Sequence, residues 1–344
     1  MESRISWLLW AALSAAVSPG QAQTGCTWIE RSDQFADRHA NVWVHMGDLR
    51  TGQRLTIRGE FPHARYMSLE VYDASGRIVD SLTDTSILEI RGWNPFLPGM
   101  NRTKPYFGEF EIDVRMEERP AADRPANTLY VGAPSTGGHR LFLLLYRTLL
   151  LDRSLPGGNP PRIVYRGAPN QGSCPVGPWS AGPPKRLIGA AGELPPRLPE
   201  KLFEWTKLTP AATGAIQADI RYTFARIGVT PGRILFLTIP PFQAPVGVER
   251  AEPFPESAAL RYWSVSFGPL YGSTERTLAD FEIPQSRHLY VGLGGTPRPV
   301  EIPPEEWVGL NMITGFVTVR QVLPVREPDT LVPKWSEMTV IRSK

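Results

Sequence analysis

The chain has 344 residues, with 37 lysines and arginines against 34 aspartates and glutamates. These charges are dispersed and form no basic stripe, so nucleic acid is not an expected partner. A chain of this length has room for two hydrophobic cores of ordinary size.

The first residues have the pattern of a secretory signal. An apolar run at residues 5–17 follows Arg4, and the small residues Gly20 and Ala22 stand where a signal peptidase cuts. The run is shorter than the roughly 20 residues that a transmembrane helix needs, and no later segment is apolar enough. We therefore predict a signal peptide at residues 1–22, export to the periplasm or the extracellular medium, and no stable membrane span after cleavage.

Two cysteines follow the predicted cleavage point, Cys26 close behind it and Cys174 in a coil-like stretch. An even number of cysteines in an exported protein favours a disulfide. We predict one bond between them, worth roughly 2–4 kcal/mol through the entropy of the unfolded chain. Neither cysteine has a neighbouring histidine or helix start that would activate a thiolate, so a catalytic thiol is not expected.

A unit at residues 65–87 recurs without a gap at residues 261–283. The shared residues keep every spacing: Arg65, Tyr66, Ser68, Leu82, Asp84 and Ile87 recur as Arg261, Tyr262, Ser264, Leu278, Asp280 and Ile283. Three further pieces, at residues 54–59, 129–132 and 141–151, have counterparts in the same order at residues 233–239, 289–292 and 308–319. This order predicts two related domains.

Short stretches with alternating apolar and polar residues, or with an almost unbroken apolar run, predict β-strands. They lie at residues 41–46, 54–59, 65–72, 77–80, 109–115, 129–131, 141–151, 219–226, 233–239, 261–267, 289–292, 308–319 and 338–341. In the repeated strand, Met67, Leu69 and Val71 should face a core, and so should their counterparts Trp263, Val265 and Phe267. The run at residues 141–151 is almost wholly apolar, so we expect both of its faces to be covered.

Glycine- and proline-rich turns separate these strands, and no stretch predicts an amphipathic helix longer than two turns. We predict an all-β fold of two tandem, related β-sandwich domains of jelly-roll type, at residues 23–153 and 201–344. Prolines exclude helix and central strand from residues 154–200, which should form an irregular connection. A single large sandwich built from two halves is the alternative.

The polar residues shared by the two copies are predicted to serve the fold. Asp84 and Asp280 stand where a carboxylate commonly caps a turn or accepts backbone N–H bonds. Arg65 and Arg261 begin the repeated strand, and we expect an arginine–aspartate pair within each repeat.

Function is expected where the copies differ. His63, Asp73 and Asp80 have no counterpart of the same type, and with Asp84 they are the candidate acid and base groups of a hydrolase or lyase. No HExxH, GxSxG, P-loop or dinucleotide motif accompanies them. Neither a metal site nor a cofactor is predicted from the histidine and cysteine spacing.

Insertions around each copy are the second place to expect function, because long loops on a β scaffold commonly carry binding surfaces. One lies between residues 87 and 129, and the other at residues 242–258. Four rings of the first insertion, together with Tyr72, predict a ligand-binding surface: Trp93, Phe96, Tyr106 and Phe107. The alternative is that these rings cover an open end of the sheet.

The stretch FPHARYMSLEVYDASGRIVDSLTD at residues 61–84, the Asn94-Pro95-Phe96 that follows and the second copy resemble a group of bacterial exported proteins of unknown function. Ser68, Leu69, Tyr72 and Asp73 are also similar to jelly-roll domains of unknown function in which such a strand precedes a glycine turn. The second copy departs from that pattern at Gly268 and Pro269. The resemblance implies a β-sandwich and assigns no activity.

The leading interpretation is a non-enzymatic exported protein that binds a small molecule, a glycan or a protein through loops of one domain. Aromatic, proline-rich insertions without a catalytic motif in the sequence favour it. Two alternatives stay open. One is a hydrolase or lyase with a pocket around His63 and nearby carboxylates, and the other is a structural component of the envelope.

Overall fold

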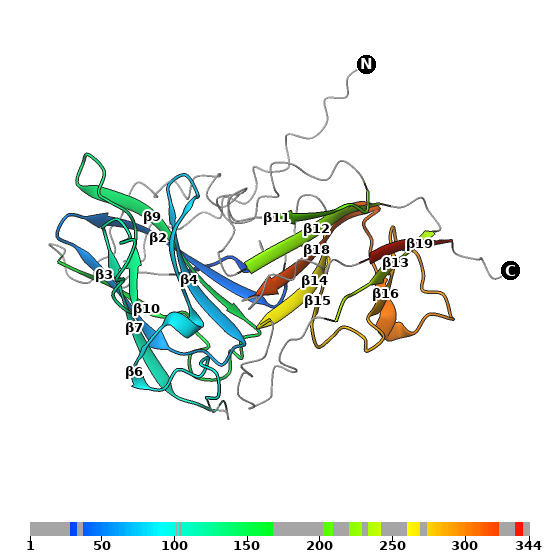
Figure 1. Cartoon of the computed structure of the whole chain (residues 1–344), viewed down its shortest axis with the longest axis horizontal. Helices are drawn as coiled ribbons and strands as arrows, with labels where there is room; N and C mark the ends of the chain where they lie inside the picture. The colour runs from blue at the N-terminus through cyan, green and yellow to red at the C-terminus, as the bar shows by residue number, and fades with distance from the viewer. Residues whose placement is uncertain are drawn as a thin grey trace, which may run out of the picture.

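The computed structural model describes residues 28–32, 37–100, 102, 105–167, 202–208, 220–228, 233–241, 260–268, 274–322 and 334–339. These residues form β-sheets and short 3-10 turns with no α-helix among them, which confirms the predicted all-β fold (Figure 1). The predicted signal peptide, Cys26, Cys174 and the insertion at residues 242–258 lie outside the described residues. We call residues 28–167 the first half and residues 202–339 the second half.

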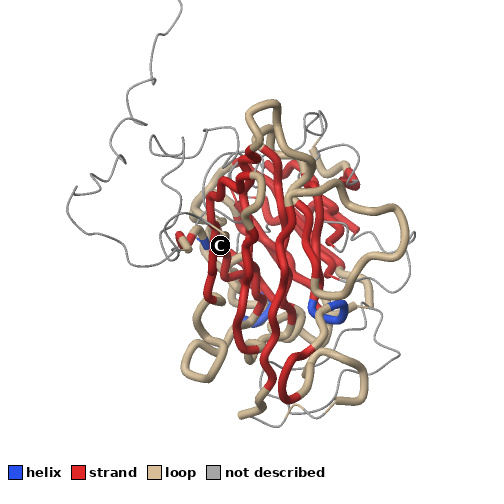
Figure 2. Tube along the Cα trace, turned by 90° about the vertical axis from the view of Figure 1, so that its left-hand side faces the viewer, coloured by secondary structure: helices blue, strands red, loops and turns tan. Residues whose placement is uncertain are grey.

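Two sheets make the first half. The first sheet has the order β1 (Ile29–Glu30), β2 (Ala40–Arg50), β9 (His139–Leu149), β4 (Tyr66–Asp73) and β5 (Ile78–Thr83). The second sheet has the order β10 (Arg162–Arg166), β3 (Arg54–Glu60), β7 (Gly108–Arg115) and β6 (Glu89–Gly92), with β8 (Thr128–Tyr130) parallel to β7. Figure 2 looks onto this half and shows most strands running in one general direction, with loops gathered at their two ends.

Two more sheets make the second half. One has the order β11 (Trp205–Leu208), β12 (Ile220–Gly228), β18 (Thr314–Val322), β14 (Tyr262–Gly268) and β15 (Arg276–Ala279). The other has the order β17 (Trp307–Gly309), β16 (His288–Gly292), β13 (Arg233–Thr238) and β19 (Lys334–Thr339). The short turns η2 (Asp84–Ser86) and η4 (Pro304–Glu306) complete the named elements.

The first sheets of the two halves have the same strand order and the same register. Ser68 of β4 lies opposite Arg147 of β9, and Ser264 of β14 lies opposite Arg320 of β18. Strand β18 is therefore the counterpart of β9, and the alignment of residues 308–319 with residues 141–151 is shifted from the one expected.

The repeated strand presents the predicted face to each core. Met67, Leu69 and Val71 lie in the core of the first half, and Trp263, Val265 and Phe267 lie in the core of the second. Alternation of side chains across a strand is sufficient to explain both sets.

Both faces of β9 are buried, as its apolar run predicts. Phe142 and Leu144 point into the core of the first half. Leu145 and Leu149 belong instead to a cluster that also holds Tyr262 and Val322 of the second half, among others. The first sheets of the two halves therefore pack against each other (Figure 1).

The insertion after residue 87 contributes strands to the sheet. Its β7 pairs with β3 on one side and with β6 on the other, and Phe110, Ile112 and Val114 of β7 are buried in the core. In the second half, β16 pairs directly with β13. Much of this insertion is thus part of the scaffold rather than an exposed loop.

The first sandwich also continues beyond the boundary expected at residue 153. Strand β10 pairs with β3 and places Ile163 and Tyr165 in the core. It lies at the edge of its sheet, where the preceding prolines are tolerated because an edge strand leaves half of its N–H groups unpaired.

Candidate functional site

The arginines and aspartates shared by the two copies pair across the copies. Arg65 Nη1 lies 2.6 Å from Oδ1 and 2.5 Å from Oδ2 of Asp280, and Arg261 Nη1 lies 3.9 Å from Oδ2 of Asp84. The predicted pairing within each repeat is therefore wrong. The two first sheets pack face to face, so the start of each repeated strand meets the other half of the molecule.

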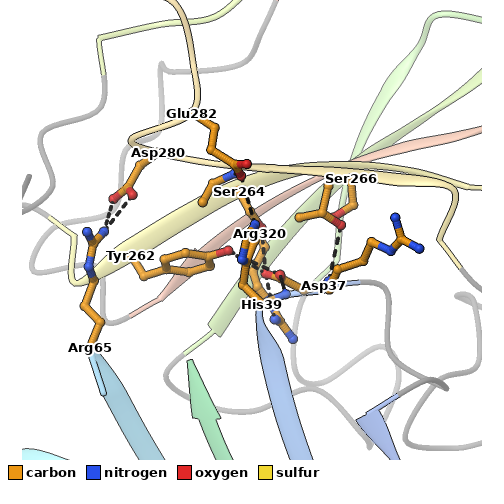
Figure 3. Close-up of polar contacts among 12 residues, drawn as sticks. Asp37, His39, Arg65, Tyr262, Ser264, Ser266, Asp280, Glu282 and Arg320 are labelled. Carbon is orange, nitrogen blue, oxygen red and sulfur yellow. Dashed lines mark hydrogen bonds and ion pairs between the residues drawn. The ribbon is translucent and has the colours of Figure 1, made fainter. Parts of the chain in front are cut away.

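The Arg65–Asp280 pair is closed, in the sense that its charged groups are in direct hydrogen-bond contact. Its side chains are only 2% and 6% exposed, and the Arg65 guanidinium lies 5.7 Å from the centre of the Phe281 ring. Figure 3 shows Nη1 of the arginine contacting both carboxylate oxygens. Burying two charges is costly unless they are in direct contact. Here Nη1 contacts both oxygens, while Nη2 has no hydrogen-bond partner among the described residues.

The Arg261–Asp84 pair is open, in the sense that the two charged groups make no direct hydrogen bond. Asp84 is 0% exposed, and its Oδ2 accepts a hydrogen bond of 3.3 Å from the backbone N–H of Met67. Its Oδ1 is buried and accepts no well-formed hydrogen bond within the described part of the chain. Burial raises the pKa of Asp84, and Arg261 only partly opposes that shift. Burial raises the pKa of Asp280 as well, so the two copies differ in their contacts rather than in the direction of the shift. The same residue of the repeat is thus satisfied in one copy and not in the other.

Three side chains found only in the first copy form a series of contacts that leads to Asp84. The rings of His63 and Tyr106 stack with their centres 3.8 Å apart, and both residues are buried. Arg102 is a close neighbour of both Tyr106 and Asp84, and burial lowers its pKa.

Backbone carbonyl groups hold these side chains in place. Tyr106 Oη donates to the carbonyl of Pro62 at 2.7 Å, and Arg102 Nη2 donates to that of Ala64 at 2.6 Å. From the second half, Arg261 Nη2 donates to the carbonyl of Phe96 at 3.1 Å. These carbonyls lie in the segments just before β4 and within the first insertion.

Thr148 adds a second buried acceptor. It lies opposite Met67 in the β4–β9 pairing, so its side chain shares the core-facing side of the sheet with Met67. Its Oγ1 is buried and has no hydrogen-bond partner among the described residues. We call His63, Asp84, Arg102, Tyr106, Thr148 and Arg261 the polar end of the first sandwich.

The other candidate carboxylates lie elsewhere. Asp73 shapes the turn between β4 and β5, where its Oδ1 accepts from Ser75 and its Oδ2 pairs with Arg77 at 3.0 Å. Asp80 pairs with Arg124 at 2.9 Å and accepts from the N–H of Tyr130 at 3.0 Å, so it fastens β5 to β8. Asp84, rather than Asp73 or Asp80, is connected to His63, through the Tyr106 side chain that lies near both.

The candidate aromatic residues do not form one exposed surface. Phe96 is in the hydrophobic core, and Tyr72 is buried between the halves, where it donates to Glu70 at 2.6 Å. Trp93 and Phe107 are half-buried, and the Arg91 guanidinium lies 5.2 Å from the Phe107 ring centre. Tyr106 alone of the five joins the polar end.

Sequence reasoning missed Arg102, Thr148 and the charged residues between the sheets. One signal was available, because Arg147 interrupts the apolar run of β9 and is almost fully buried. A lone arginine in such a strand indicates a partner on a facing surface. Arg102 offered no comparable pattern.

The raised pKa of Asp84 predicts how stability depends on pH. A carboxyl whose pKa is raised by folding stabilises the fold in its protonated form, and that contribution is lost as pH rises through the folded-state pKa. The side chain of Asp84→Asn cannot ionise, so this variant keeps the stabilising contribution as pH rises. As pH rises above the usual range of an aspartate carboxyl, we expect the free energy of unfolding of the unsubstituted protein to fall relative to that of Asp84→Asn. Urea unfolding at a series of pH values measures the difference, and a difference that falls with pH would contradict the assignment.

Across the described ranges, histidine, cysteine and carboxylate side chains do not gather in groups of three or more that could hold a metal ion. The same ranges contain no helix with the length and hydropathy needed to cross a bilayer.

No protein-family model matches the sequence, and no curated protein matches it either. Among solved structures, the chain is similar to an uncharacterized protein from Burkholderia cenocepacia, with a TM-score of 0.55 and 14% identity over 91% of this chain and 81% of that one. The VPA0106 protein from Vibrio parahaemolyticus aligns with a TM-score of 0.41 and 10% identity over 90% of this chain and 91% of that one. The structural neighbours are thus uncharacterised bacterial proteins, and the likeness to the first shows the fold alone.

Proposed function

We propose that this is an exported, non-enzymatic binding protein whose small-molecule or glycan ligand binds at the polar end of the first sandwich. One observation carries the proposal. Asp84 Oδ1 is a buried acceptor that no described residue satisfies, whereas both carboxylate oxygens of its counterpart Asp280 contact Arg65. The fold accommodates a satisfied aspartate at this position of the repeat, so the unsatisfied oxygen of Asp84 is a candidate acceptor for a ligand. The signal pattern at residues 1–22 supports export.

The groups present suit a small ligand with a hydrogen-bond donor. Asp84 and Thr148 both neighbour Met67, since Asp84 accepts from its N–H and Thr148 lies opposite it in β9. Asp84 Oδ1 and Thr148 Oγ1 are buried acceptors with no hydrogen-bond partner among the described residues. The stacked rings of His63 and Tyr106 supply a flat, largely apolar wall. Binding sites for small molecules commonly combine such apolar walls with a few convergent polar groups.

Ligand-dependent thermal stabilisation tests the proposal. A ligand present at 100 times its Kd should stabilise the folded state by about 2.7 kcal/mol and raise Tm. A panel of neutral hydroxylated compounds and oligosaccharides should contain such a ligand. Asp84→Asn should abolish the shift because it replaces an acceptor carboxylate, whereas Asp73→Asn, in the distant β4–β5 turn, should keep it. The proposal fails if no compound raises Tm or if Asp84→Asn responds as the unsubstituted protein does.

A hydrolase or lyase around His63 is the second candidate function. The observation that favours it is the presence of an imidazole and a carboxyl of raised pKa in one buried cluster, an arrangement that acid–base chemistry uses. Turnover of chromogenic esters or glycosides that disappears in His63→Ala would support it. Turnover that is unchanged in His63→Ala would remove His63 from the reaction.

A further inference from the structure

A carboxylate of the first half lies in a polar site on the second half. Asp37 immediately precedes the turn into β2, and its Oδ2 accepts from Ser264 Oγ at 2.8 Å, Tyr262 Oη at 3.0 Å and Arg320 Nη1 at 3.1 Å. Its Oδ1 accepts from the backbone N–H of His39 at 2.9 Å and lies 3.2 Å from Tyr262 Oη. Figure 3 shows these donors converging on the Asp37 carboxylate.

The donors belong to adjacent strands of one sheet. Tyr262 and Ser264 point from β14 to the same side, and Arg320 of β18 lies directly opposite Ser264. Tyr222 of β12 orients the guanidinium, because Arg320 Nε and Nη2 donate to its hydroxyl at 3.2 and 2.9 Å. The sheet therefore fixes a charged donor and two hydroxyl donors independently of the segment that carries Asp37.

In the first copy, the corresponding serine and arginine have a carboxylate on the repeated strand itself. Its counterparts of Ser264 and Arg320 are Ser68 and Arg147, which lie opposite each other in the same register. There the carboxylate is Glu70 of β4 itself, whose Oε1 accepts from Ser68 Oγ at 3.0 Å. The residue that corresponds to Glu70 in the second copy is Ser266, which has no charge.

We infer that the second sandwich carries a carboxylate-binding site, formed by Tyr262, Ser264 and Arg320, and that Asp37 is its built-in occupant. Asp37 supplies the carboxylate that the second copy lacks on its own strand. Neighbouring contacts bring Asp37 to it, since the N–H of Arg38 donates to Thr277 Oγ1 at 3.3 Å. The contact also joins the two halves of the chain.

Chemical rescue by a small carboxylate tests this inference in the full-length protein. Asp37→Gly removes the side chain and leaves room for a free anion, so its Tm should be lower than that of the unsubstituted protein in sodium chloride. Sodium formate at equal ionic strength should raise that Tm in a saturable way, by about 2 °C at ten times the dissociation constant. Asp37→Asn is the matched control: its amide fills the space, so formate should not raise its Tm above the chloride value.

The response must also depend on the donors. Adding Ser264→Ala to Asp37→Gly should weaken the apparent affinity for formate about tenfold, which corresponds to the loss of one charge-assisted hydrogen bond. Equal Tm values of Asp37→Gly in formate and chloride would overturn the inference, and so would the same formate response in Asp37→Asn.

A second measurement applies if Asp37→Gly does not fold. The losses of Tm in Asp37→Asn and Ser264→Ala are then compared with the loss in the double variant. Two members of one site should give a double loss smaller than the sum of the single losses. Additive losses would show that Asp37 and Ser264 act independently and would overturn the inference.

Discussion

Asp280→Asn is expected to lower the free energy of unfolding by about 3 kcal/mol, the lower end of the cost of breaking a buried ion pair. The substitution leaves the Arg65 guanidinium almost fully buried without the carboxylate that its Nη1 contacts at 2.5 and 2.6 Å. The amide keeps the shape of the side chain, so the loss reports the charge rather than a cavity. Urea unfolding at neutral pH, followed by tryptophan fluorescence, measures it.

Asp84→Asn is the matched control, because Asp84 occupies the same position in the other copy of the repeat. Its nearest guanidinium nitrogen, on Arg261, is 3.9 Å away, and the amide can still accept from the N–H of Met67. We expect a change within about 1 kcal/mol at neutral pH, since the substitution removes only this long contact with Arg261 and no direct hydrogen bond to a guanidinium. Equal losses in the two variants would mean that both pairs serve the fold alike. The asymmetry on which the proposed ligand site rests would then be lost.

Phe110→Ala is expected to cost about 3–5 kcal/mol, the usual penalty for truncating a buried phenylalanine. Phe110 lies in β7, within the insertion of the first copy, and its ring centre is 5.2 Å from that of Phe61 in the core. The large expected loss follows from the position of β7 between β3 and β6. Denaturant unfolding of the purified variant measures it.

Ile90→Ala in the neighbouring β6 is the control for this prediction. Ile90 is 49% exposed, and substitutions at exposed positions usually change stability by no more than about 0.5 kcal/mol. A tolerated Phe110→Ala would show that the insertion forms a loop outside the core. The difference between the two variants therefore separates a scaffold strand from an appended segment.

The repeated strand was predictable because its information is local. Alternation alone assigns Met67 and Val71 to one face and Tyr66 to the other, and the structure confirms the core-facing set. The unbroken apolar run of β9 likewise indicated two covered faces, and the structure supplies the cover from both halves. The sequence pattern did not indicate that the second cover is the other copy of the repeat.

The position of β7 in the sheet was not predictable. Its alternating pattern marks a strand, but pairing with β3 joins residues far apart in the chain, and nothing in the pattern selects that partner. Strand β10 was missed for a different reason: the prolines before it suggest irregular structure, yet they are compatible with an edge strand.

Only some residues of the polar end could be predicted from the sequence. His63 and Tyr106 were singled out as differing between the copies or belonging to an insertion, whereas Arg102 and Thr148 were not.

The sequence by itself determined the repeat, the strands and the side of each strand that faces a core, because side-chain alternation is a property of the local backbone. Only the tertiary structure decided which charges meet. Arg65 reaches Asp280, Arg261 approaches Asp84 and Asp37 reaches Arg320 because two sheets distant in sequence pack face to face. Charge partners across such an interface depend on the relative position of whole sheets, and no spacing along the chain encodes that position.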